Sequence, residues 1–178
     1  MMNSLIDRRI PAPATKPVSD SLEQLNATAD MMLSRALLGS ERISSGGIRD
    51  RRDSVSVRVE SVFQSKTTLY VLYTVRNQSS RPYRVVTPTV IAAVAPKPGV
   101  SLVALSHYQL DPPTLAKLGT LKERNLNVAR SETARQDLAP GEATQGVVAI
   151  REQMESPILI QLNFGSDGTR RVQAVMVF

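Results

Sequence analysis

The order of apolar and polar residues divides the chain into one segment with helical periodicity and a longer part with strand periodicity. Within residues 20–38 apolar side chains recur every three or four positions, which predicts one amphipathic helix. Asp20, with Glu23 three residues later, resembles a capping box, and Gly39 supplies a stop. This stripe can pack on its own domain or on a neighbouring subunit. The partner-binding residues predicted on it are Leu22, Leu25, Ala29, Met32, Leu33 and Ala36.

Two segments without either periodicity flank the predicted helix. Residues 1–19 contain Pro11, Pro13 and Pro17, which disfavour a helix and are typical of an extended arm. Residues 39–54 are rich in glycine, serine and charged side chains, a composition that predicts a linker. The chain is therefore expected to begin with an arm, a helix and a linker.

After the linker the apolar period changes from 3.6 to 2. Val55, Val57 and Val59 alternate with polar residues, as in a strand with one solvated face. Residues 69–76 place apolar side chains on both faces, which predicts a central or doubly covered strand. Residues 77–82 supply a turn whose polar side chains are expected to satisfy its own backbone.

The remainder of the chain continues the strand pattern. After Asp111, a plausible N-cap, a short helix is predicted that ends at Gly119, while residues 120–137 favour either a helix or a long loop. The Asp167-Gly168 pair predicts a hairpin turn. Six to eight short strands with turns between them predict a mainly β fold, an antiparallel immunoglobulin-like β-sandwich over residues 55–178. The further strands are predicted over 85–95, 101–110, 145–151, 156–164 and 170–178.

The composition argues against most catalytic chemistry. The 178 residues include no cysteine and one histidine, which excludes disulfides, thiolate zinc sites and a cysteine nucleophile. His107 is expected to be structural, because a lone histidine in a strand is rarely a catalyst. Asp137 and Glu142 flank a Pro-Gly turn and are expected to be solubilising charges, not a glycosidase pair. No catalytic, cofactor-binding or metal-binding residue is predicted.

The net charge of +6 does not add a predicted binding site, because the basic residues are dispersed along the sequence. The densest cluster, Arg49, Arg51 and Arg52, is interrupted by Asp50 and Asp53. With four tyrosines, three phenylalanines and no tryptophan, the chain lacks the basic, aromatic-rich stripe typical of nucleic-acid binders. A solvated basic surface is therefore predicted, and no nucleic-acid partner.

Hydropathy predicts no membrane span, since no apolar run reaches the length that one needs. The N-terminus also has no apolar run long enough for a signal-peptide core. We therefore expect either a protein that stays in the cytoplasm or a virion, or a periplasmic or cell-envelope protein whose export signal is missing from this sequence.

The stretch from Asp53 to Pro96 resembles the β-sandwich domain of conjugal-transfer and type IV secretion core-complex subunits. The resemblance is carried by a strand, a turn and a following strand that match at Leu69, Tyr70, Asn77, Ser79, Tyr83 and Val85. Residues 138–150 also resemble a strand lead-in common in bacterial immunoglobulin-like sandwiches. The resemblance implies an exported protein. The arm and the 20–38 helix of this chain have no counterpart in the subunits that it resembles.

These observations predict a non-catalytic structural or assembly subunit of a multi-protein complex, with a bacterial envelope conjugation or secretion machine as the first candidate. Its partners would be other protein subunits, including copies of itself, and it would need no cofactor. One alternative is a structural protein of a phage or virus-like particle, because such proteins combine a sandwich with an arm and a helix. The other is a soluble module that binds a peptide or carbohydrate through loops 77–82 and 120–137.

Overall fold

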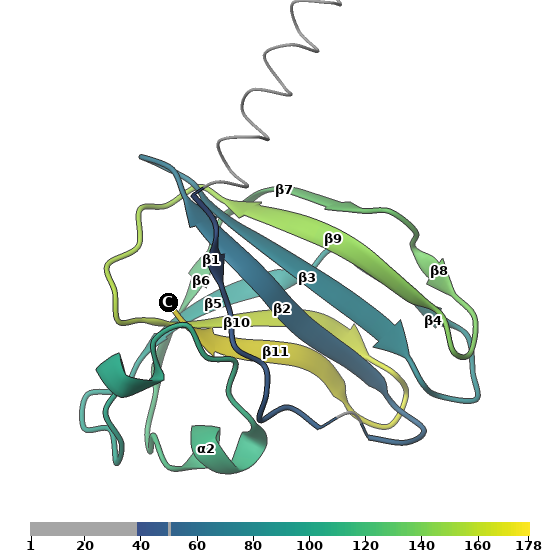
Figure 1. Ribbon diagram of the computed structural model, residues 1–178, viewed down its shortest axis with the longest axis horizontal. Coiled ribbons are helices and arrows are strands. Elements are labelled where there is room, and N and C mark those ends of the chain that lie inside the picture. Colours follow the sequence, from purple (N-terminus) through teal and green to yellow (C-terminus); the bar gives the residue numbers. More distant parts are fainter. Residues whose placement is uncertain (1–38, 50) are drawn as a thin grey trace, which may run out of the picture. The chain divides into compact units, whose positions relative to one another are not determined.

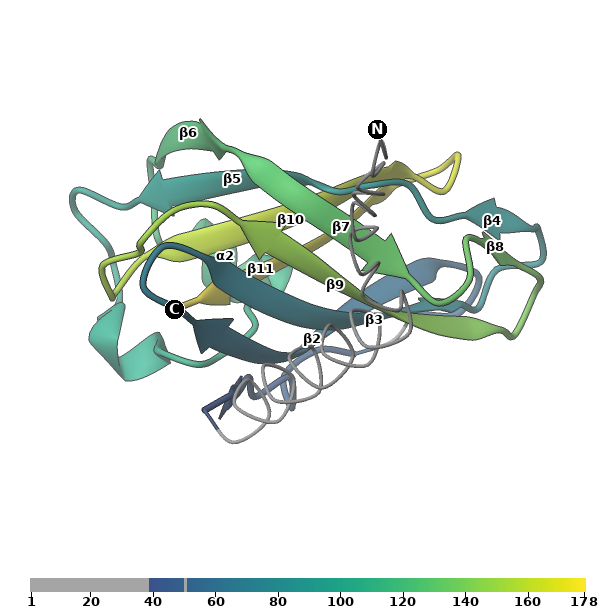
Figure 2. The ribbon, with the colours of Figure 1, turned by 90° about the horizontal axis from the view of Figure 1, so that it is seen from above.

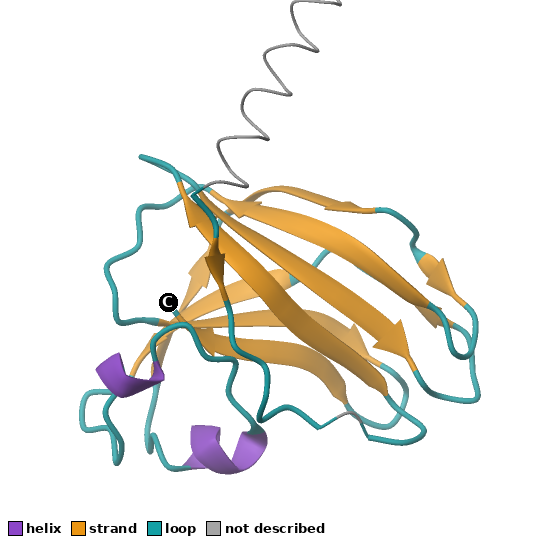
Figure 3. Ribbon diagram, viewed as in Figure 1, coloured by secondary structure: helices purple, strands orange, loops and turns teal. Residues whose placement is uncertain are grey.

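The described part of the chain consists mainly of antiparallel strands. The computed structural model describes residues 39–49 and 51–178, and Gly39–Phe178 form one compact unit. Strands dominate this unit, and its helical content is limited to short turns (Figure 3). The predicted mainly β fold, an antiparallel sandwich, is confirmed for it. The predicted arm over 1–19 and helix over 20–38 lie outside the described residues.

The first layer is a five-stranded antiparallel sheet in the order β1-β2-β3-β9-β7 (Figure 1). Val55, Val57 and Val59 of β2 are buried, as the alternating pattern predicted. β3 occupies the central position, in agreement with its two apolar faces. The bounds are β1 Glu41–Arg42, β2 Val55–Gln64, β3 Leu69–Asn77, β7 Val128–Thr133 and β9 Ala143–Ile150.

The second layer is a four-stranded antiparallel sheet in the order β11-β10-β5-β6 (Figure 2). One hydrophobic core joins the two sheets and includes Tyr73 and Val148 from the first and Leu162 and Phe164 from the second. The rings of Tyr73 and Phe164 meet edge to face, with their centroids 4.8 Å apart. The bounds are β5 Thr89–Val94, β6 Lys122–Leu126, β10 Leu159–Ser166 and β11 Arg171–Val177.

A small two-stranded sheet, β4 Tyr83–Arg84 with β8 Asp137–Leu138, completes the strand pairing in the described residues. The Tyr83 hydroxyl ties it to the core by donating a hydrogen bond to the Phe164 carbonyl over 2.8 Å. Burial, reinforced by the negative charge of Asp167, raises the pKa of Tyr83 to about 12.

Residues 101–110 do not form the predicted strand, and that prediction is wrong. The segment contains the 3₁₀ turn η1, Val103–Leu105, and it packs over the outer face of the second sheet. Leu102 and Leu110 join Val175 and Val177 there in a second, smaller apolar cluster. The apolar run is therefore explained by packing against a sheet, which does not require the run to be a strand itself.

The short helix that follows is confirmed. α2, Pro112–Ala116, begins after Asp111, whose Oδ1 accepts a hydrogen bond from the Thr114 backbone N–H over 2.9 Å. Gly119 then adopts a φ of +73°, in the left-handed region that glycine tolerates best.

Residues 120–137 form neither a helix nor a loop, which corrects the sequence-based expectation. They contain β6 and β7, which lie at the outer edges of the two sheets. Four of the five residues of β6 are exposed and only Leu126 is buried, so the strand has almost no apolar alternation. An edge strand with charged side chains is protected against unwanted pairing, and its sequence resembles a loop for that reason.

Part of the range predicted as a linker, residues 39–54, belongs to the sandwich. Glu41 and Arg42 pair with Val62 and Ser61 of β2, and Ile43 is buried in the core. A strand of two residues is too short to show an alternation of apolar and polar side chains. The prediction of a linker therefore rested on composition alone.

Asp167 closes the predicted hairpin between β10 and β11. Its Oδ1 accepts hydrogen bonds from the Thr169 and Arg170 backbone N–H groups over 2.9 and 2.8 Å. Its Oδ2 accepts one from Val55, over 3.3 Å. Desolvation acts to raise the pKa of Asp167, but the bonds from Thr169, Arg170 and Val55 outweigh it and lower the pKa to about 2.

We expect Asp167→Asn to lower stability above about pH 4 and to lose this effect toward pH 2. The folded pKa is depressed from 3.8 to about 2, so the contribution is present above the unfolded value and disappears as the pH falls through the folded value. Urea unfolding of wild type and variant across this range measures the difference. Glu155→Gln, at an exposed position, is the control. A stability difference that does not change with pH would contradict the assignment.

Candidate protein-interaction surfaces

The predicted partner-binding stripe cannot be placed on the structure. Leu22, Leu25, Ala29, Met32, Leu33 and Ala36 all lie outside the described residues. The candidate surfaces described next therefore belong to the sandwich unit, and the stripe stays a prediction.

The turn after β3, one of the two predicted binding loops, is held from within by Asn77. The Asn77 side chain is fully buried, and its Nδ2 donates to the carbonyls of Arg81 and Leu138 over 2.8 and 3.1 Å. Its Oδ1 accepts from the Ser79 N–H and hydroxyl over 3.0 and 2.7 Å. The expectation that polar side chains of this turn form hydrogen bonds with its own backbone is confirmed. The side chains of Asn77 and Ser79 are therefore already engaged within the fold.

His107 lies in a turn, not in a strand as the sequence predicted. Its φ of +64° is left-handed, a conformation in which histidine is enriched among non-glycine residues. Its Nδ1 lies 3.0 Å from Oε2 of Glu41, and both side chains are about half exposed. This pair links the turn to β1 at the surface of the sandwich, which is a structural arrangement.

Asp137 and Glu142 each have a structural partner. Glu142 accepts from the Ala139 backbone N–H over 2.9 Å and from the Arg135 guanidinium over 2.6 Å. These bonds lower the pKa of Glu142. Asp137 lies 3.7 Å from the Arg84 guanidinium. Each carboxylate thus pairs with its own arginine beside the 139–142 turn.

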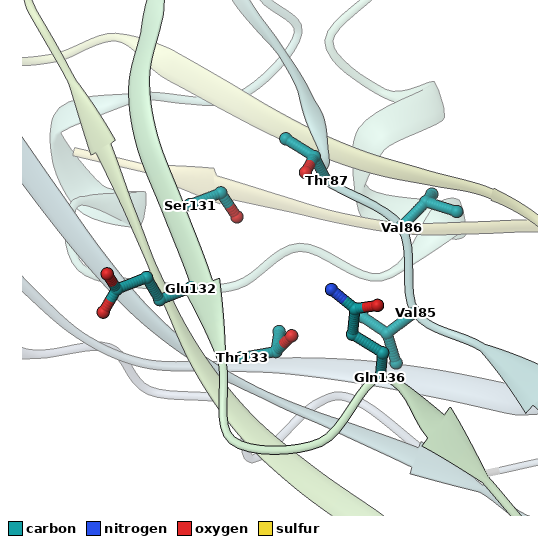
Figure 4. Close-up of a pocket in the computed structure, with 7 residues that line it drawn as sticks. All are labelled: Val85, Val86, Thr87, Ser131, Glu132, Thr133 and Gln136. Atoms are coloured by element: carbon teal, nitrogen blue, oxygen red, sulfur yellow. The ribbon is translucent and has the colours of Figure 1, made fainter.

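A polar pocket of about 300 Å³ lies between β7 and the segment that leads into β5. Figure 4 shows the Ser131, Thr133 and Thr87 side chains around the opening, while the Glu132 carboxylate points away from it. Hydroxyls without an adjacent base do not make an activated nucleophile. No group of three or more His, Asp or Glu residues in the described part of the chain could hold a metal ion. This pocket therefore supports binding of water or a small polar group better than catalysis.

The outer face of the five-stranded sheet presents apolar side chains to solvent. Tyr70 and Leu72 of β3 are 36% and 38% exposed. In register, Phe63 of β2 lies beside Tyr70, and Val147 of β9 lies beside Leu72. The Phe63 and Tyr70 rings are tilted against each other, with centroids 6.0 Å apart. We call these four residues the outer apolar patch; contiguous apolar surface of this kind often marks an interface.

A second surface, which the sequence reasoning missed, is the groove between β2 and β11. It has a volume of about 950 Å³ and brings Arg49 and Arg51 to the same site as Arg170 and Arg171. More than a hundred residues separate the two arginine pairs, so no local pattern could have revealed the cluster.

No protein-family model matches the chain, and no curated protein matches its sequence. Among solved structures, it is similar to the archaellum periplasmic stator protein FlaG from Sulfolobus acidocaldarius. That match has 10% identity and a TM-score of 0.38, over 69% of this chain and 98% of that one. The FlaF–FlaG stator complex from the same organism matches with 8% identity and a TM-score of 0.39, over 76% and 98% of the respective chains.

Proposed function

We propose that the protein is a non-catalytic structural subunit of a multi-protein assembly. The observation that carries the proposal is the outer apolar patch, where Tyr70 and Leu72 are each more than a third exposed on the outer face of the central strand. A sheet face that contacts only water would be expected to carry polar residues at these positions. In the sandwich that carries the patch, the buried side chains of Asn77 and Gln109 donate hydrogen bonds to backbone carbonyls.

The amphipathic stretch over residues 20–38 is the second proposed contact. Its leucine and methionine stripe gains stability only when another apolar surface covers it. The finer proposal, a bacterial envelope conjugation or secretion machine, is supported by the motif that includes Leu69, Asn77 and Tyr83. In the sandwich, Asn77 and Tyr83 of this motif hold a turn and a small sheet. None of the helices that the structure describes is long and apolar enough to cross a membrane.

We expect Leu25→Asp to reduce the assembled full-length protein to monomer, because a carboxylate in the buried stripe costs several kcal/mol, on the order of the whole contact. Light scattering at several concentrations measures the mass, and thermal melting reports the sandwich. Gln24→Asp places the same charge on the polar side of the stretch and should leave assembly intact.

A melted sandwich in Leu25→Asp would contradict the connector role and make the stretch part of the core. A wild-type chain that stays monomeric alone and with candidate envelope proteins would count against the assembly proposal. Such a monomer, with a melting temperature that rises when peptides or sugars are added, would favour the binding module.

A further inference from the structure

We propose that the groove between β2 and β11 binds an extended acidic peptide of a partner protein, which adds a strand to the free edge of β11. This surface goes beyond the contacts proposed for the 20–38 stretch and the outer apolar patch. The recognition mode is β-augmentation, in which main-chain bonds give affinity and side-chain contacts give selectivity.

The chain itself already occupies part of the position beside β11. The Leu110 N–H donates to the Val175 carbonyl over 2.7 Å, and the Val177 N–H donates to the Tyr108 carbonyl over 3.0 Å. Residues 107–110 therefore lie antiparallel beside the C-terminal half of β11 and are joined to it by a single bridge, Gln109 with Met176, without forming a strand. At Asp111 the chain turns away into α2 (Figure 1). The groove begins there, next to Arg171 and Gln173.

The exposed side of β11 has backbone groups available for pairing. β11 is the edge strand of its sheet and pairs with β10 on its other side. Because the Val175 carbonyl faces the groove side, the backbone of Gln173, two residues earlier, faces the same way. Within the described ranges, no backbone bond reaches Gln173 from that side. An incoming strand can therefore continue where residues 107–110 end.

The opposite wall of the groove is closed to such pairing by side chains. The Gln109 amide is buried: its Oε1 accepts from the Val59 N–H over 2.9 Å, and its Nε2 donates to the Val57 carbonyl over 2.8 Å. The Asp167 carboxylate accepts from the Val55 N–H. These two side chains take the place of a strand beside β2, so β11 is the edge that a peptide can extend.

The floor of the groove is apolar and its rim is cationic. Val57, Leu110 and Val175 line the floor. Arg49, Arg51, Arg170 and Arg171 line the rim, and none of them forms an ion pair within the part of the chain that the structure describes.

The two carboxylates of the lining, Asp111 and Asp167, offset two of the four arginine charges, and neither forms an ion pair with an arginine among the described residues. Asp111 and Asp167 accept hydrogen bonds from backbone N–H groups of their own turns. The lining therefore keeps a net positive charge, and its four guanidinium groups, unpaired among the described residues, can bind carboxylates of a partner, with which arginine forms strong charge-assisted bonds.

The lining favours a peptide over a nucleic acid, because it includes no aromatic side chain on which a base could stack. It also disfavours segments of this chain. Residues 1–19 carry Arg8, Arg9 and Lys16 against one acidic residue, Asp7, and their three prolines lack the N–H that pairing needs. The β11 edge of a second copy carries the same arginines and would be repelled. An acidic, extended segment of another protein fits both the charge and the edge.

The test uses the full-length protein and a fluorescent peptide of about eight residues in which glutamate and valine alternate, enough to span the open edge. Fluorescence anisotropy measures binding, and hydrogen exchange reports the Gln173 amide. We expect binding with protection of this amide. The same peptide with backbone N-methyl groups, or with lysine for glutamate, should lose at least about tenfold in affinity.

We expect Arg170→Glu with Arg171→Glu to weaken binding by at least about tenfold. Lys122→Glu with Arg130→Glu makes the same charge change on β6 and β7, at the opposite edges of the two sheets, and should retain binding. Leu25→Asp should also retain it, which separates this surface from the proposed assembly contact. The N-methylated peptide tests the edge on wild-type protein, whatever the stability of the variants.

Three results would overturn the proposal. The first is that the glutamate-valine peptide does not bind the wild-type protein. The second is equal binding of the N-methylated peptide, which would show that no strand is added. The third is a DNA duplex that binds as tightly as the peptide and competes with it, which would make the groove a general polyanion surface.

Discussion

Asn77→Asp should strongly destabilise the sandwich at neutral pH. Nδ2 of Asn77 donates to the carbonyls of Arg81 and Leu138 from a fully buried position. A carboxylate there would point an anion at two carbonyl oxygens and remove the amide donor from both, leaving the Ser79 hydroxyl, 2.9 Å away, as the remaining side-chain donor to the Arg81 carbonyl. We expect a loss of several kcal/mol, about 3 or more, since a buried unsatisfied polar group alone costs about 1–3 kcal/mol and a charge costs more.

The pH dependence of the loss in stability separates the cost of burying the charge from the cost of losing the two hydrogen-bond donors of the amide. Burial raises the pKa of a carboxyl group above its unfolded value of about 3.9, so the charge penalty of the aspartate is complete above the raised folded pKa, shrinks as the pH falls from there toward about 3.9, and is absent below it. Urea unfolding at pH 7 and near pH 3.5 measures both parts. Asn77→Ala should cost less than the aspartate at neutral pH, and Gln78→Glu, the same amide-to-acid change one residue later, should cost little. Equal midpoints for wild type and Asn77→Asp would show that these bonds do not hold the turn.

Gly146→Ala should destabilise the same sheet by overpacking. Gly146 of β9 lies opposite Tyr73 of β3, and an added Cβ would lie 2.6 Å from the Tyr73 ring and 2.7 Å from the Thr133 methyl group. Tyr73 cannot yield easily, because it is 1% exposed and packs edge to face on Phe164. We expect a loss of about 1–3 kcal/mol, although alanine is otherwise preferred to glycine within a strand.

A double-mutant cycle identifies the clash as the cause. A Tyr73→Leu background removes the contact with the ring but keeps the Thr133 methyl group 2.7 Å from the added Cβ, so Gly146→Ala should cost less there without becoming neutral, with a coupling energy of about 1 kcal/mol. Gly47→Ala is the control, because no atom lies within 4 Å of the Cβ that it would add. If the two effects simply add, contact with the tyrosine ring does not explain the loss.

The sequence predicted those strands whose side chains alternate because one face is buried. Val55, Val57 and Val59 show this pattern, and so does the apolar strand over 69–76 at the centre of its sheet. β6 gave no such signal, because it is an edge strand with nearly every residue exposed. Residues 101–110 were predicted as a strand because they are apolar, but their leucines pack on the outer face of a sheet instead.

The interaction surfaces were less predictable than the fold, for a related reason. The stripe over 20–38 is local and could be read from spacing alone, yet it lies outside the described residues. The basic groove forms where the segment with Arg49 and Arg51 lies near the β10–β11 hairpin. In the sequence, Asp50 and Asp53 interrupt the first arginine pair, so local charge did not indicate a basic site there. Only the packing of the two sheets against each other brings the arginines together.

The buried amide of Asn77 also bears on production of the protein in eukaryotic cells. Asn77, Gln78 and Ser79 form an N-glycosylation triplet. In the folded sandwich the amide nitrogen is buried and already donates two hydrogen bonds, so an oligosaccharyltransferase could modify it only before the turn closes. A glycan attached at that moment would prevent closure. Material glycosylated at Asn77 should therefore be unfolded, and the folded fraction should carry an unmodified Asn77, whether or not the second triplet at Asn26 is occupied.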